Sequence, residues 1–212
     1  MLPLSFILSD AYSLIESGKG AMYYGLVHYP DVNTRLIGRI RGRYDPTARM
    51  IAPHIPILFP LPDEIGESVL ISHTENILKS WKPFPIHIHG LFKSWDHWLM
   101  LAVEEGNEAV RKLHREIYSG ILSKYRRKDI EYIPHIALGL FVKSMSDYSL
   151  KNPQKTAFDS DAYEKAVHET SMMKPDFRAL FDRLQLVRIK HHFTKIENRL
   201  EFLLEQISGA VL

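Results

Sequence analysis

The chain of 212 residues contains no cysteine. Disulfide bonds, thiolate metal ligands and cysteine nucleophiles are therefore excluded. Long apolar runs are also missing: the apolar start over residues 1–10 is too short for a membrane span and lacks the basic residues and cleavage pattern of a signal peptide. We expect no membrane association and a cytoplasmic location, with residues 1–21 forming an N-terminal extension packed against the fold.

Several familiar catalytic signatures are also absent. No glycine-rich phosphate or dinucleotide loop occurs, and no Gly-x-Ser-x-Gly elbow marks a serine hydrolase. The histidine pairs His87/His89 and His191/His192 have no acidic partners at metal-ligand spacing. We therefore expect neither a metal nor a cofactor.

The composition is that of an ordinary folded chain. It is 45% hydrophobic and 25% charged, with a formal net charge of +2. This apolar content suffices for a compact core, and no shift in composition marks a linker, so residues 1–212 are predicted to form one domain. The small positive excess permits an anionic ligand but is too weak for electrostatic coating of long nucleic acid.

Strand and helix patterns alternate along the chain, with adjacent hairpins. Because hairpins join antiparallel strands, the pattern favours an α+β fold over a parallel doubly wound sheet. A final hairpin is predicted to turn at Glu197-Asn198. Strands are predicted over 23–29, 50–59, 84–92, 98–104, 132–142, 185–193 and 199–206, and helices over 32–43, 65–81, 107–125 and 161–173, with 177–184 continuing or restarting the last helix.

One short motif occurs twice. Residues 53–59 read PHIPILF and residues 134–141 read PHIALGLF, which places His54 and His135 81 positions apart. A predicted helix precedes each motif, and a helix and a strand pair follow it, as expected of two pseudo-symmetric lobes. Alternate residues of a strand face the same side. The two imidazoles are therefore predicted to face one cleft from the central strands of the two lobes.

Two opposed histidines suit phosphodiester chemistry. An unperturbed imidazole titrates near pH ~6.5, so one ring can be neutral while the other is protonated. The neutral ring accepts a proton from the attacking hydroxyl or water, and the protonated ring donates one to the leaving oxygen, without a metal. A single strand histidine is more often structural, but two in matching contexts favour catalysis.

The duplicated motif resembles that of the two-histidine (2H) phosphoesterases. This superfamily includes bacterial RNA 2′,5′-ligase/cyclic phosphodiesterase proteins and plant cyclic phosphodiesterases, and its signature is His, apolar, Thr or Ser, apolar, occurring twice. The resemblance covers about residues 22–207. It implies a bilobal α+β fold of two pseudo-symmetric antiparallel-sheet lobes, with flanking helices and a central groove. It also implies a metal-independent phosphodiesterase with His54 and His135 as catalytic base and acid.

The sequence departs from this family pattern at the hydroxyl positions, which are Pro56 and Ala137. In the family these hydroxyls hold phosphate oxygens. A hydrogen bond to a charged group is worth roughly 1.5–3 kcal/mol, so losing two in the transition state slows the chemistry by on the order of 10²–10⁴. Either other residues supply the clamp, or the substrate differs, or catalysis is lost and binding is kept.

Other side chains are candidates for substrate contacts. Basic and aromatic residues near the predicted strand ends suit a phosphate or a base, although each also fits a solvated or structural role. The candidates are Tyr132, His89, Lys93, Arg43, Lys190 and His192.

Three functions follow from these features. The first is a phosphodiesterase acting on a cyclic phosphate or a 2′,5′ linkage in RNA or a nucleotide, with hydrolysis and ligation both open. The second is an RNA- or nucleotide-binding module that has lost efficient turnover. The third is a structural or partner-binding α+β protein with coincidental histidines. In the first two cases the expected partner is RNA or a nucleotide, bound by a monomer.

Overall fold

A computed structural model describes residues 22–148, 152–190 and 195–204. The predicted extension over residues 1–21 and the candidate His192 lie outside the described residues. In chain order, the elements are β1 (Tyr23–His28), α1 (Arg35–Tyr44), β2 (Ile55–Pro62), α2 (Glu67–Leu78), β3 (Phe84–Lys93), β4 (Trp98–Val103), α3 (Asn107–Ile117), β5 (His135–Leu140), α4 (Ser160–Met173), β6 (Asp176–Phe181), β7 (Arg183–Ile189) and β8 (Ile196–Leu203).

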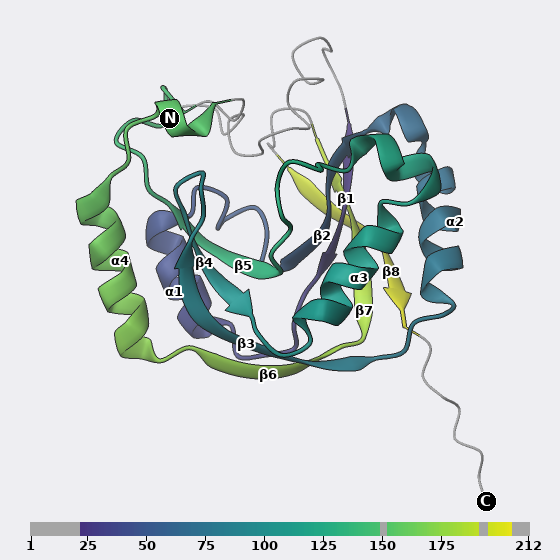
Figure 1. The fold of residues 1–212 in the computed structure, drawn as a ribbon, viewed down its shortest axis with the longest axis horizontal. Helices are drawn as coiled ribbons and strands as arrows, with labels where there is room; N and C mark the ends of the chain where they lie inside the picture. The colour runs from purple at the N-terminus through teal and green to yellow at the C-terminus, as the bar shows by residue number, and fades with distance from the viewer. Residues whose placement is uncertain (1–21, 149–151, 191–194, 205–212) are drawn as a thin grey trace, which may run out of the picture.

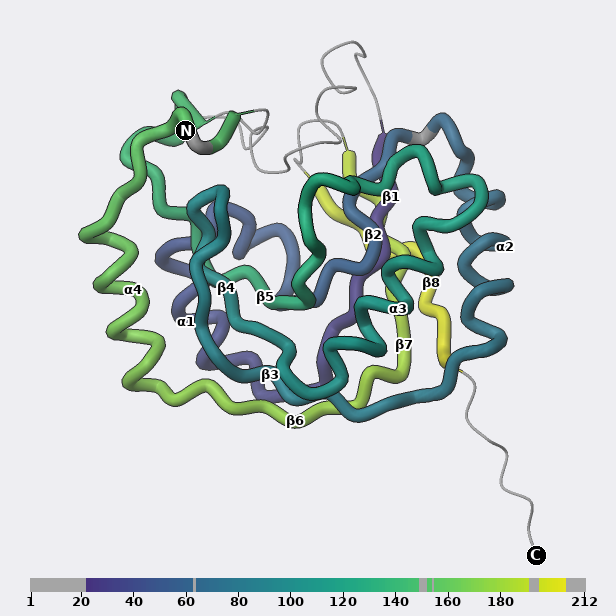
Figure 2. Tube along the Cα trace, viewed as in Figure 1, coloured from purple at the N-terminus to yellow at the C-terminus, as the bar shows by residue number. Residues whose placement is uncertain are grey.

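The strands form two antiparallel sheets of four. One has the order β2-β1-β7-β8 and the other the order β5-β4-β3-β6. This arrangement confirms the predicted bilobal α+β fold. The sequence analysis predicted that the two histidine strands, β2 and β5, are central in their sheets, and this prediction is wrong. Each is an edge strand, and the two edges lie side by side in the middle of the molecule (Figures 1 and 2).

Two helices cross from one sheet to the other. Helix α1 connects β1 to β2 but packs against β5, whereas α3 connects β4 to β5 but packs against β2 (Figure 1). Gly139 of β5 allows the first crossing, because a Cβ at this position would lie 2.5 Å from the Cβ of Tyr44 at the end of α1. Each lobe therefore covers the motif strand of the other.

The crossing helices join both sheets into one hydrophobic core. On α3, Val110, Leu113 and Ile117 recur at helical spacing and are fully buried. The same core contains Ile57 of β2 and Ile136 of β5, each close to a motif histidine in sequence. The motif strands are thus anchored through their inward side chains, which leaves the alternate side chains available for a site.

Three predicted elements differ from the observed ones. Helix α3 ends at Ile117 rather than continuing to Tyr125; Gly120, with φ of 53°, begins a separate 3₁₀ turn there. The predicted helical segment 177–184 forms strand β6 and the start of β7, because the more buried Phe177, Ala179 and Phe181 alternate with exposed residues at period two. The hairpin does not turn at residues 197–198, which pair within β8 with Arg188 and Val187.

No helix in the described part of the chain is long and apolar enough to cross a membrane.

Candidate active site

His54 and His135 occupy matching positions at the entrances of the two edge strands. His54 directly precedes β2, and His135 is the first residue of β5. In each case ring Nδ1 is hydrogen-bonded to the carbonyl oxygen two residues earlier, at 2.8 Å to Ala52 and 2.5 Å to Ile133. Because a carbonyl can only accept, Nδ1 carries the proton and Nε2 of the neutral ring is an acceptor. Both rings are thus held in the tautomer that a proton-transfer site requires.

The proline before each histidine explains why the motif repeats as Pro-His-Ile. Pro53 and Pro134 have a fixed φ and restrict the preceding residue to extended conformations. The preceding residue supplies the carbonyl that accepts from each Nδ1. The prolines therefore preorganise the two ring orientations.

The protein environment favours the neutral form of both rings. Burial, together with the nearby charge of Arg41, lowers the pKa of His54 to about 4, while the hydrogen bond to the Ala52 carbonyl and the carboxylate of Asp45 oppose the change. A positive charge on His135 also lowers the pKa of His54, so the two rings interact electrostatically. Burial lowers the pKa of His135 as well. A bound phosphate opposes these shifts, because a nearby anion favours the protonated imidazole.

A buried ion pair anchors the loop that leads into His54. The guanidinium of Arg41 lies 2.6 Å from the carboxylate of Asp45, and both side chains are almost fully buried. The same guanidinium donates to the carbonyl of Ile51 at 2.9 Å, next to the carbonyl of Ala52 that receives His54 Nδ1. Arg41 therefore fixes the backbone that orients His54.

A pocket opens beside His54. Its volume is about 430 Å³, and its walls come from residues 29–34, residues 50–53 and the start of β8. The ring of Tyr29 contacts the His54 ring edge-on, with 6.1 Å between centroids. The hydroxyl of Tyr29 donates to the amide oxygen of Asn198 at 3.3 Å. Tyr29 thus belongs to both the pocket and the surroundings of His54.

Apolar side chains lie beside His135, and the carboxylate of Asp96 is close enough to oppose the lowering of its pKa. Phe92 of β3 contacts the His135 ring edge-on, with centroids 6.4 Å apart. Ala137 pairs with Met100 across the β4–β5 ladder. Both pack against a small cluster separate from the main core, which consists of Trp98, Leu140 and Tyr148. The family's second hydroxyl position therefore forms part of an apolar surface.

Tyr132 links the second motif segment to the first motif. Its hydroxyl donates to the carbonyl of Pro56 at 2.8 Å, and its ring stacks on His114 at a centroid distance of 3.8 Å. His114 in turn is hydrogen-bonded to the carbonyl of Ile57. These side chains satisfy backbone groups of the edge strand β2, where Pro56 stands at the family's first hydroxyl position.

His89 lies on the same face of its sheet as His135. His135 of β5 pairs with Ala102 of β4. Two residues after Ala102, the carboxylate of Glu104 lies 3.4 Å from His89 Nδ1. Half of the His89 side chain is exposed. The structure therefore places His89 beyond Ala102, along the surface that begins at His135.

The three predicted basic contacts have partners away from the two histidines. Lys93 lies over the ring of Phe158, with its Nζ 4.5 Å from the centroid, and Arg43 pairs with Glu169 of α4 at 2.7 Å. Lys190 lies 3.0 Å from Glu197.

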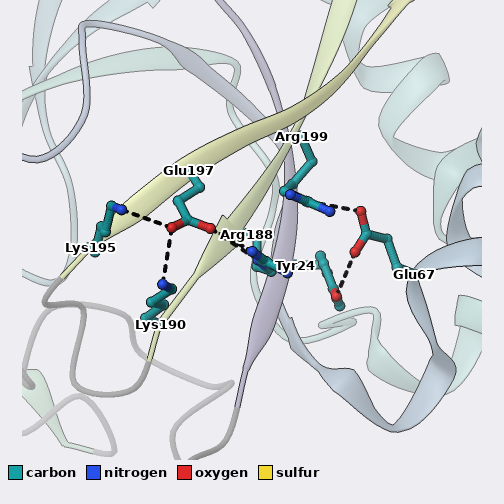
Figure 3. Close-up of polar contacts among 7 residues, drawn as sticks. All are labelled: Tyr24, Glu67, Arg188, Lys190, Lys195, Glu197 and Arg199. Atoms are coloured by element: carbon teal, nitrogen blue, oxygen red, sulfur yellow. Dashed lines mark hydrogen bonds and ion pairs between the residues drawn. The ribbon is translucent and has the colours of Figure 1, made fainter.

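Figure 3 shows the carboxylate of Glu197 in ion pairs with Lys190, Lys195 and Arg188. Arg188 pairs with Tyr24 across the sheet, on the face opposite to Val27 and Pro56. Lys190 is therefore directed away from the face that carries His54. His135 acts electrostatically on His54, and Tyr132 contacts Pro56 on the His54 strand. Lys93, Arg43 and Lys190 have partners elsewhere.

Sequence reasoning did not single out Tyr29 and Asn198, and it placed Arg41 no higher than its neighbour Arg43. Tyr29 had a faint signal, an aromatic residue at a strand end before Pro30. Asn198 had none, since its approach to Tyr29 depends on how β8 joins the sheet. Within residues 22–148, 152–190 and 195–204, no cluster of three or more histidine, cysteine or acidic residues could hold a metal ion.

The fold has counterparts of known structure. LigT of Escherichia coli in complex with 3′-AMP superposes with a TM-score of 0.55 at 11% identity, covering 88% of this chain and 99% of LigT. TT0787 of Thermus thermophilus superposes with a TM-score of 0.51 at 13% identity, covering 87% and 97% of the two chains. At such low identities the similarity shows a shared fold.

Sequence similarity points to the same class. A protein of Bacillus licheniformis named "Putative phosphoesterase" is 28% identical over 123 residues, which cover 55% of this chain and 70% of that protein. The family model of the 2′-5′ RNA ligase superfamily matches residues 29–192, a range that contains both Pro-His-Ile motifs. The fold and the paired motifs define a two-histidine phosphoesterase architecture. The chain belongs to the 2′-5′ RNA ligase superfamily.

Proposed function

We propose that this protein is a metal-independent phosphodiesterase that acts on a cyclic phosphate or a 2′,5′-phosphodiester in RNA or a nucleotide. The observation that carries the proposal is the matched pair of histidines, each with Nδ1 bound to the carbonyl two residues earlier. Support also comes from the fold neighbour LigT, whose structures include complexes with 3′-AMP and with ATP.

For a cyclic phosphate the two rings divide the proton transfers. The neutral ring accepts a proton from water through Nε2 as the water oxygen attacks phosphorus. The bond from phosphorus to one ribose oxygen breaks, and the protonated ring donates its proton to that leaving oxygen. The product is a phosphomonoester, and the two histidines exchange protonation states. His54 and His135 fill these two roles.

The decisive assay measures turnover of nucleoside 2′,3′-cyclic phosphates and 2′,5′-linked oligonucleotides by the purified protein. His54→Ala and His135→Ala are each expected to lower kcat by about 10²–10⁴, the usual contribution of a positioned acid or base. His168→Ala is the matched control, because His168 is an exposed histidine on α4. Activity that survives unchanged in both motif variants would exclude the mechanism.

A second candidate function is an RNA- or nucleotide-binding module with weak or no turnover. Pro56 and Ala137 favour it, since neither side chain can donate to a phosphate oxygen. This function predicts measurable affinity for 2′,3′-cyclic nucleotides without product formation. Absence of both binding and turnover contradicts both candidates.

The proposal includes a cytoplasmic location and a monomeric state. Fluorescence microscopy of the tagged protein in its native cell tests the first. Light scattering of the purified chain tests the second, for which a mass near 24.6 kDa is expected.

A further inference from the structure

The pocket beside His54 has an uncharged lining. Its polar groups are the side chains of Tyr29, Thr34 and Asn198, and its apolar walls include Met50, Ile51 and Ile196. Burial raises the pKa of Tyr29 to about 12, so its phenol stays neutral at physiological pH. Among residues 22–148, 152–190 and 195–204, no charged side chain lines the pocket, so it lacks the cations that form charge-assisted hydrogen bonds to a phosphate.

The size and polarity of the pocket suit a neutral heterocycle. A volume of about 430 Å³ falls within the usual range for small-molecule sites, and the lining offers uncharged hydrogen-bonding groups beside apolar ones. The Asn198 carboxamide offers both donors and an acceptor, as does the hydrogen-bonding edge of a nucleobase. Tyr29 and Asn198 are already joined by a hydrogen bond, so the two groups are held in a common orientation.

The pocket is also connected to the proposed catalytic centre. Ala52 and Pro53 line it, and the carbonyl of Ala52 orients the His54 ring. Tyr29 contacts that ring from the pocket side. A group in the pocket would therefore lie next to a phosphate held between His54 and His135.

We propose that this pocket binds the nucleobase attached to the scissile phosphate, with Asn198 reading its polar edge and Tyr29 holding the amide in place. The inference rests on the proposed phosphodiesterase function and adds the site that recognises the base of the nucleotide substrate. Asn198 lies beyond residues 29–192, the range matched by the superfamily model. The proposed base recognition therefore involves strand β8, which lies outside the matched range.

Two substrates that differ only in the base provide the test. Adenosine 2′,3′-cyclic phosphate is compared with methyl ribofuranoside 2′,3′-cyclic phosphate, in which a methoxy group replaces the base. The native chain is expected to prefer the nucleotide in kcat/KM. Asn198→Ala is expected to reduce this preference about tenfold, which corresponds to ~1.4 kcal/mol, because kcat/KM falls more for the nucleotide than for the base-free substrate. Tyr29→Phe, which removes only the hydroxyl, is expected to act in the same direction.

Asn76→Ala is the matched control, because Asn76 is an exposed asparagine on α2 outside the pocket lining. Equal turnover of the two substrates by the native chain would overturn the inference, as would an equal effect of Asn198→Ala on both. Either result would leave the phosphodiesterase proposal intact.

A binding measurement separates the two proposals if no turnover is found. Adenosine is titrated into the chain carrying His54→Ala and His135→Ala, and the NMR signal of the Asn198 side-chain amide is followed. A saturable shift supports the base pocket even without catalysis. Tyr29→Phe is expected to abolish this shift or to weaken the affinity for adenosine at least several-fold. No shift at millimolar adenosine overturns it.

Discussion

One backbone carbonyl and one proline fix the orientation and tautomer of each motif histidine, His54 and His135. The carbonyl of residue i−2 fixes the tautomer, and the proline at i−1 fixes the carbonyl. Burial then lowers both imidazole pKa values below the ordinary 6.5, so the ligand-free protein carries both rings neutral at pH 7. The proposed catalysis by one neutral and one protonated ring consequently requires acidification or the charge of the bound substrate.

The first residue-scale prediction concerns the pH dependence of kcat/KM, which reports the pKa values of the free enzyme. Because both pKa values lie below 6.5, the state with one proton on the pair is most populated at acidic pH. We expect the maximum of kcat/KM on a cyclic nucleotide below pH 6.5, with activity falling toward neutral pH. A maximum above pH 7 contradicts the lowered pKa values.

The second residue-scale prediction concerns Arg41 and Asp45. Arg41→Met removes a positive charge near His54 and is expected to raise the His54 pKa, whereas Asp45→Asn removes a negative charge and is expected to lower it. An NMR titration of the His54 ring measures both. Loosening of the loop alone would shift the two variants in the same direction, because each breaks the same ion pair. Arg43→Met, at an exposed pair with Glu169, is expected to leave this pKa unchanged.

At the scale of elements, the edge strands β2 and β5 carry Pro56 and Ala137 at the family's two hydroxyl positions. Pro56 lies in the edge strand that Tyr132 and His114 bind through its backbone carbonyls. Ala137 packs with Met100 on an apolar surface of β4 and β5. The strand geometry that places a side chain next to each histidine is kept, but the side chains there are not donors.

The element-scale prediction restores one donor. Ala137→Thr introduces a hydroxyl beside His135 and is expected to raise kcat/KM on a cyclic nucleotide by about tenfold, as one hydrogen bond to a charged group allows. Ala137→Val is the control, because valine has nearly the shape of threonine without the hydroxyl. Steady-state kinetics of the two variants decide the matter: equal rates mean that residue 137 does not contact the phosphate.

At the scale of the whole molecule, the packing of the core buries further histidines, including His28 and His114. His28 is fully buried, with Nδ1 bonded to the carbonyl of Arg183 and its ring stacked on Phe181. His114 is buried between α3 and β2. Burial lowers the pKa of each to about 4. Between pH 6.5 and about 4 the unfolded chain binds more protons than the folded one, so the free energy of unfolding falls as the pH falls.

The molecule-scale prediction isolates the contribution of His28 to the pH dependence of the free energy of unfolding. Acidification from pH 7 to pH 5 is expected to lower the free energy of unfolding of the native chain, and His28→Leu is expected to reduce this loss by about 2 kcal/mol. The variant is less stable at pH 7, because the carbonyl of Arg183 loses its donor. Urea unfolding at both pH values measures the difference. His168→Leu, at an exposed position, should show the native pH dependence, and an equal loss in His28→Leu would contradict the assignment.

Local patterns in the sequence determined the antiparallel α+β class, most of the helices and strands, and the paired histidines with their altered neighbours Pro56 and Ala137. These features depend on residue spacing along one strand or helix, which the chain displays directly. Only the tertiary structure decided which residues surround each histidine. Arg41 rather than Arg43 supports His54, Tyr132 binds the opposite lobe, and Asn198 reaches Tyr29 from the last strand. Such contacts join residues far apart in sequence, and their geometry is set by how the two sheets and the crossing helices pack, which no local periodicity encodes.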